Sequence, residues 1–144
     1  NKATTMNKPI GAFLSPGHIY GFDFIYAGEI RFGPPYYHMV LQGKFILDRI
    51  FGFEFKWDDQ ARYLALQEWL LGEASGQPLT ALSIIDTTHQ KISLATPWDR
   101  SLIFPIEFKE EILSYEKEYI QDDIRTQHQL CLTELTNWTD WKEG

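Results

Sequence analysis

The chain has 144 residues, a formal net charge of −7 and one cysteine, Cys131. One cysteine excludes an intramolecular disulfide and a cysteine-based metal site. No stretch approaches the roughly 20 apolar residues that span a bilayer, and an acidic chain lacks the basic surface that nucleic acids require. We therefore expect neither a membrane nor a nucleic-acid partner.

A hydrophobic fraction of 44% and an aromatic fraction of 15% predict one ordered domain over residues 1–144. Cys131 lies between two leucines, so we expect it to be a small buried hydrophobic residue rather than a reactive thiol. A single cysteine fits a reducing compartment and predicts a cytoplasmic location. The first residue, Asn1, leaves room for a targeting signal removed by processing.

In chain order, residues 1–17 contain two prolines and two glycines and are expected to form an irregular lead-in. Residues 18–26 are rich in Ile, Tyr and Phe and predict a strand that bends or bulges at Gly21. The Ala27-Gly28 pair is expected to turn the chain into a further strand over residues 29–32.

Three hairpins are then predicted from polar corners between apolar runs. They join residues 36–41 to 44–48, 53–57 to 62–70, and 79–86 to 91–94. In the second corner, Asp58 and Asp59 are expected to hydrogen-bond the nearby backbone rather than bind calcium or share a proton. A strand over residues 101–108 follows, and Pro105 marks it as an edge strand or a bulge.

Two segments fit either a helix or a strand. Residues 58–71 contain helix formers behind a potential cap at Asp58, but the hairpin context favours a strand. Within residues 107–121, helical spacing competes with strand-like alternation, and we favour the strand. The predicted fold is mostly β, an antiparallel sheet or sandwich of consecutive hairpins with blade-like units, with one short helix allowed near residues 107–121.

The run from Trp57 through Asp58-Asp59-Gln60 to Ala65 resembles the corner of TolB-type and WD-repeat propeller blades. In those blades an aromatic residue, an acidic turn and a small-aromatic-aliphatic strand recur. Their turn usually carries proline and glycine, which this corner lacks. The resemblance implies a local blade-like hairpin over residues 53–66, and it transfers no propeller function.

The acidic residues gather in the last third of the chain. Residues 1–100 hold ten Asp and Glu against nine Lys and Arg, whereas residues 101–144 hold ten against four. Such a surface suits a basic protein partner, because opposite fields speed encounter. The candidate partner-binding residues are acidic or aromatic: Glu116, Glu118, Tyr119, Asp122 and Asp123, together with Tyr36 and Tyr37 beside two prolines.

No cofactor or metal is expected, because the four histidines are not spaced as ligands and no catalytic motif is present. Trp138 and Trp141 near the C-terminus are expected to dock on the domain. In size and acidity the chain is similar to bacterial immunity proteins that neutralise toxins. This predicts a non-catalytic protein that covers a basic surface of a toxin. The alternatives are a structural or scaffold β module, such as a fragment of a repeat protein, and a small-molecule-binding domain with an aromatic pocket.

Overall fold

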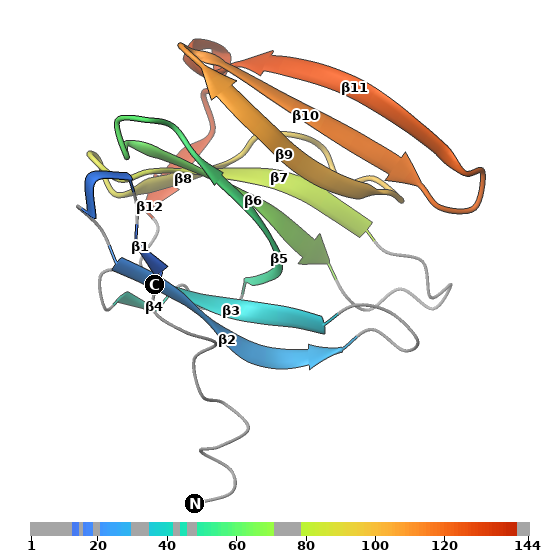
Figure 1. Cartoon of the computed structure of the whole chain (residues 1–144), viewed down its shortest axis with the longest axis horizontal. Coiled ribbons are helices and arrows are strands. Elements are labelled where there is room, and N and C mark those ends of the chain that lie inside the picture. The colour runs from blue at the N-terminus through green and yellow to red at the C-terminus, as the bar shows by residue number, and fades with distance from the viewer. Residues whose placement is uncertain are drawn as a thin grey trace, which may run out of the picture.

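The strands pair antiparallel throughout and form two sheets (Figure 1). The computed structural model describes residues 13–14, 16–18, 21–29, 35–41, 44–45, 49–70 and 79–140. Sheet A contains, in spatial order, β1 (Phe13–Leu14), β2 (Gly21–Glu29), β3 (Pro35–Leu41), β5 (Ile50–Trp57), β6 (Tyr63–Leu70), β7 (Leu79–Asp86), β8 (Lys91–Leu94) and β12 (Trp138–Asp140), and β4 (Lys44–Phe45) pairs with β3. Sheet B contains β11 (Ile124–Cys131), β10 (Ile112–Tyr119) and β9 (Leu102–Lys109). Two short 3-10 helices, η1 (Pro16–His18) and η2 (Leu132–Glu134), complete the described elements.

The predicted mostly-β fold of consecutive antiparallel hairpins is confirmed. The β3–β4, β5–β6 and β7–β8 pairs are the three expected hairpins, although residues 42–43 and 46–48 lie outside the described part. At the second corner, Asp58 Oδ1 accepts hydrogen bonds from the backbone N–H groups of Arg62 and Tyr63 at 2.8 and 2.9 Å. Asp58 therefore closes a turn instead of capping a helix.

Residues 107–121 form the end of β9, a turn and β10, so the short helix allowed there does not occur. Pro105 has both of its predicted roles. It lies in β9, an outer strand of sheet B, and it pairs with Tyr115 while Glu107 pairs with Ser114. Ile106 is thus the extra residue of a bulge.

The predictions for residues 18–29 are wrong in two details. His18 belongs to η1, and the strand begins at Gly21. Ala27-Gly28 does not turn the chain; β2 continues to Glu29, with Ala27 as a bulge between the Tyr26–Tyr37 and Gly28–Tyr36 pairs. A Cβ at Gly28 would lie 2.5 Å from the Tyr36 hydroxyl oxygen. Glycine therefore lets the Tyr36 ring pack closely here rather than forming a turn.

One face of sheet A carries an aromatic core. Phe22 on β2 contacts Phe55 and Trp57 on β5, with ring centroids 5.1 and 5.5 Å apart. Because β3 lies between β2 and β5 in the sheet, these contacts show that the sheet curves over this face. The fully buried members of the core include Phe24, Met39, Leu41, Phe51, Leu64 and Leu66.

The other face of sheet A packs on sheet B, which lies above β6 and β7 in Figure 1. Ala65, Leu82 and Ile84 of sheet A are buried against Ile103 and Leu113 of sheet B. Strand β6 is therefore buried on both faces, as its burial pattern records.

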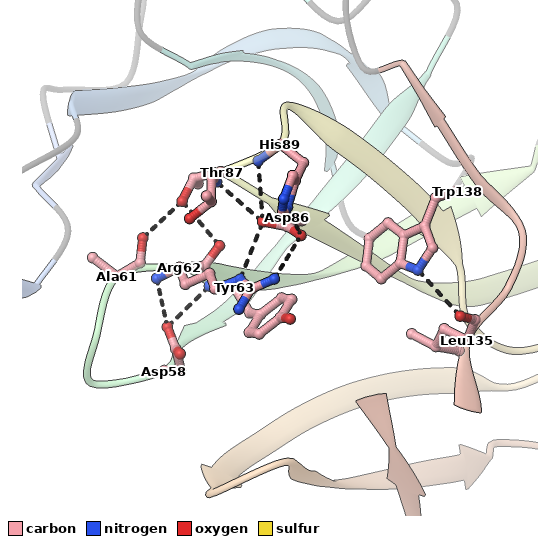
Figure 2. A network of polar contacts seen from close by, with 10 residues as sticks. Asp58, Ala61, Arg62, Tyr63, Asp86, Thr87, His89, Leu135 and Trp138 are labelled. Carbon is pink, nitrogen blue, oxygen red and sulfur yellow. Dashed lines mark hydrogen bonds and ion pairs between the residues drawn. The ribbon is translucent and has the colours of Figure 1, made fainter. Parts of the chain in front are cut away.

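The chain end closes this second core. Trp138 packs against it, and its indole N–H donates to the Leu135 carbonyl at 3.2 Å (Figure 2). The predicted docking of Trp138 is confirmed, and Trp141 lies outside the described residues. Cys131 is half-buried rather than buried, and it lies at the end of β11, an outer strand of sheet B.

Candidate functional site

Glu116 and Glu118 lie on the face of sheet B that points away from sheet A, here called the outward face. Along β10 they alternate with Leu113, which is buried between the sheets. Arg125, the cross-strand partner of Glu118, donates to Glu116 Oε1 at 2.8 Å and to Glu118 Oε1 at 3.3 Å. These carboxylates raise the pKa of Arg125, first through the Glu116 hydrogen bond. The guanidinium also lies over the Phe104 ring, 5.3 Å from its centroid.

Tyr119 points toward sheet A instead, on the same face of β10 as Lys117. The Tyr119 hydroxyl and the Lys117 ammonium both donate to Asp99 Oδ2, at 2.7 and 2.9 Å. Asp99 is held in turn by two backbone hydrogen bonds with Thr80 on β7, of 3.0 and 3.1 Å. Tyr119 is therefore a positioning residue that fastens sheet B to sheet A, and it does not join Glu116 and Glu118.

The β10–β11 turn presents acidic and apolar side chains together. Asp122 and Asp123 are exposed, and Asp123 has a φ of 54°, which Asp tolerates better than most residues. Ile120 and Ile124, on either side, are 56% and 51% exposed. The turn thus offers charge and contact area at the free end of the sheet (Figure 1).

An open groove of about 620 Å³ crosses the outward face. Its lining comes from all three strands of sheet B: Ile106, Glu107, Ser114, Tyr115, Glu116, Gln127, His128 and Gln129. Of these, only Glu116 is predicted from the sequence. Alternation along one strand assigns residues to a face, but the residues that share that face on neighbouring strands follow only from the register.

The acidic excess of residues 102–131 lies in the two turns that join the strands of sheet B, which carry Glu110, Glu111, Asp122 and Asp123, whereas the strands themselves hold three carboxylates and three cations. Residues 102–131 hold seven Asp and Glu and three Lys and Arg. Two of those cations, Lys117 and Arg125, are already in ion pairs. The remaining carboxylates, among them Glu107 and Asp122, are exposed.

Tyr36 and Tyr37 lie on β3 of sheet A, not in sheet B. Tyr37 is only 8% exposed and belongs to the aromatic core. Tyr36 is half-buried over Gly28. The two tyrosines therefore do not form one flat surface, because neighbouring residues of a strand point to opposite faces.

A second polar cluster lies where the β5–β6 and β7–β8 hairpins meet (Figure 2). Asp86 accepts hydrogen bonds from Arg62 Nη2 at 3.3 Å and from the His89 ring at 2.9 Å. Burial acts to raise the pKa of Asp86, but these bonds outweigh it and hold the pKa below its usual value. Thr87 donates to the Ala61 carbonyl at 2.9 Å. The cluster ties two hairpin ends together, which is a structural role.

Among the residues that the structure describes, no three His, Cys, Asp or Glu side chains gather as a metal-ligand set. In the same part of the chain, no helix is long and apolar enough to cross a membrane. Comparison with protein-family models, curated proteins and solved structures gives no match.

Asp99→Asn should lower the free energy of unfolding by about 1 kcal/mol at pH 7. Burial acts to raise the pKa of Asp99, but the hydrogen bonds from Tyr119 and Lys117 outweigh it, so the folded pKa lies below its usual value. The contribution is therefore full above the unfolded pKa of about 3.9 and is lost as the pH falls through the lower folded value.

Urea unfolding at pH 7 and pH 3 measures this difference for wild type and variant. The difference should shrink at pH 3, and an equal difference at both pH values would contradict the assigned role of Asp99. Tyr119→Phe is the control, since it keeps the Lys117 ion pair and should cost less.

Proposed function

We propose that this protein is a non-catalytic binder of a basic protein, and that the outward face of sheet B is its binding surface. The observation that carries the proposal is the acidic groove on a sheet whose other face is packed. Sheet B buries Leu113 and Ile103 against sheet A, while Glu107 and Glu116 face the groove. A partner side chain such as Lys or Arg would pair with these carboxylates at the cost of little rearrangement.

The Arg125 ion pairs give the surface a fixed shape. The guanidinium holds Glu116 and Glu118 in one orientation, so less side-chain entropy is lost when a partner binds. The exposed Ile120 adds apolar contact area beside Asp122. The surface thus offers a partner carboxylates to pair with and apolar area to bury.

The small size and acidity of the chain, on which its likeness to immunity proteins rests, make a bacterial toxin the partner to test first. Neutralisation would follow from covering a basic active-site or substrate-binding surface of that toxin. Placed charges would also discriminate between related toxins.

The test is capture of partners from a lysate of the native host at low and high salt, with mass spectrometry of the bound protein. We expect one stoichiometric basic partner whose capture weakens as salt rises, since salt screens exposed charges. Capture of no partner at either salt, or of one whose binding ignores salt, would contradict the proposal.

A second candidate function is favoured by a separate observation, a small cavity of about 170 Å³ between β5 and β9. Phe53, Trp69 and Phe104 contribute aromatic surface to it. A cavity of this size suits a fragment-sized apolar ligand. A rise in Tm with a metabolite mixture, absent in a Leu102→Trp variant that fills the cavity, would favour this function.

A further inference from the structure

Strand β11 is an outer strand of sheet B with eight residues, no proline and one charged side chain, Arg125. Within the described ranges, β10 alone hydrogen-bonds its backbone as a strand. A long outer strand of this kind is a template for another strand.

The opposite outer strand, β9, is different because side chains from sheet A cover it. Gln67 Nε2 donates to the Ile103 carbonyl at 2.7 Å, and Ile103 N–H donates to Thr80 Oγ1 at 3.1 Å. The outermost strands of sheet A, β1 and β12, have only two and three residues. Among the described strands, β11 therefore offers the longest open edge.

The direction of the β11 backbone groups follows from one hydrogen bond. Leu132 N–H donates to the Glu111 carbonyl at 2.8 Å, and the β10–β11 register is unbroken from the Ile112–Cys131 pair to the Tyr119–Ile124 pair. Hydrogen-bonded pairs recur at every second position of an antiparallel ladder. The backbone groups of Arg125, Gln127 and Gln129 therefore point away from β10, toward the open edge.

We infer that a second copy of this chain pairs antiparallel with β11 about a two-fold axis through Gln127. The two copies of sheet B then form one continuous sheet. In this register Gln127 faces Gln127 of the second copy, and the other facing pairs are Arg125 with Gln129, Thr126 with His128, and Ile124 with Leu130.

The side chains favour this register over its neighbours. The only charge on β11, Arg125, faces a neutral amide, and the 51% exposed Ile124 is covered by Leu130. An axis through His128 would instead set His128 against itself and leave Ile124 unpaired. A shift by one residue would set edge-directed backbone groups against groups already bonded to β10.

We assign the pairing strand to a second copy of the chain because residues 124–130 of β11 can face the same seven residues of another copy without a clash of like charges. The pairing goes beyond the proposed function. It extends the plane of sheet B, so that two outward faces lie side by side and one dimer presents two grooves to a partner.

Disulfide trapping tests the register on the full chain in a Cys131→Ser background. A hydrogen-bonded antiparallel pair has a Cα–Cα distance of about 5.5 Å, within disulfide range. Gln127→Cys should therefore give a covalent dimer under mild oxidation. The matched control is Gln129→Cys, which is also exposed and on the same face. In the proposed dimer it lies about 13 Å from its own counterpart, four residues along the strand, so this variant should stay monomeric.

Equal cross-linking of both variants, or of neither, would overturn the inference. Cross-linking of His128→Cys in preference to Gln127→Cys would overturn the register.

Sedimentation over a range of concentrations tests the association without a disulfide. Wild type should shift from monomer to dimer as concentration rises. Gln127→Lys sets two cations opposite each other across the axis and should weaken the dimer at least about tenfold. The control Gln121→Lys, in the exposed β10–β11 turn, should dimerise like wild type. A wild type that remains monomeric at several hundred micromolar, or equal dimerisation of both lysine variants, would overturn the inference.

Discussion

Phe24→Ala should lower the free energy of unfolding by about 4 kcal/mol. Phe24 is fully buried at the centre of the aromatic core. Its ring centroid lies 5.8 Å from that of Tyr37, 5.1 Å from that of Phe53 and 5.7 Å from that of Phe55. Truncation removes these ring contacts and leaves a cavity that strands on both sides of β2 cannot fill without breaking their pairing.

The matched control is Phe53→Ala, which removes a ring that contacts Phe24 from β5. Phe53 is 43% exposed, so its removal should cost only about 1 kcal/mol. Denaturant unfolding of both variants gives the comparison. Equal losses would show that the face of sheet A that carries Phe24 is not the packed core of the domain.

Arg49→Ala should cost about 3 kcal/mol at pH 7. Arg49 Nη1 lies 2.8 Å from Glu68 Oε1, and the Glu68 side chain is only 7% exposed. Ser83 donates a hydrogen bond to the same carboxylate oxygen. Without Arg49 a buried carboxylate keeps one neutral donor and loses its counter-charge.

The pH dependence of this loss has a definite sign. Burial raises the pKa of Glu68 above its usual value, despite the lowering by Arg49 and Ser83. A carboxyl with a raised folded pKa favours the folded state at low pH, and this advantage disappears as the pH rises from about 4.3, the unfolded value, through the folded pKa. Loss of Arg49 raises that pKa further, so the gap between variant and wild type should widen with pH.

Urea unfolding from pH 4 to pH 8 measures that gap. The double variant Arg49→Ala/Glu68→Gln is the control, because it removes the charge together with its partner and should recover much of the stability. A gap that narrows with rising pH, or a double variant no more stable than Arg49→Ala, would contradict the assigned pair.

Local turn chemistry accounts for the part of the fold that the sequence predicts. Asp58 identifies its hairpin because a carboxylate that bonds two backbone N–H groups fixes a corner within a few residues. Alternation along residues 112–119 likewise predicts β10. The alternative, a helix over these residues, does not form because Leu113 and Tyr119 must both face sheet A.

Local sequence patterns do not predict that the strands divide into two sheets. After β8 the chain leaves sheet A, forms all of sheet B, and returns so that Trp138 pairs with Ser93. Packing of the half-buried Trp138 against the second core accompanies this path, and no short segment encodes it. The same is true of the candidate site. The sequence identifies Glu116 as an acidic residue, but its hydrogen bond from Arg125 and its position beside Gln127 in the groove depend on the β10–β11 register.

The most direct test of the proposed binding surface compares two charge variants against the captured partner. Glu107→Lys/Asp122→Lys changes the outward face and the turn, and Glu54→Lys/Asp59→Lys changes exposed positions on and beside β5. Each variant changes the net charge from −7 to −3, because two carboxylates become two cations. We predict that partner affinity falls at least about tenfold for the first variant and little for the second, since placement rather than total charge decides. Equal affinities for the two variants would contradict a binding surface on sheet B.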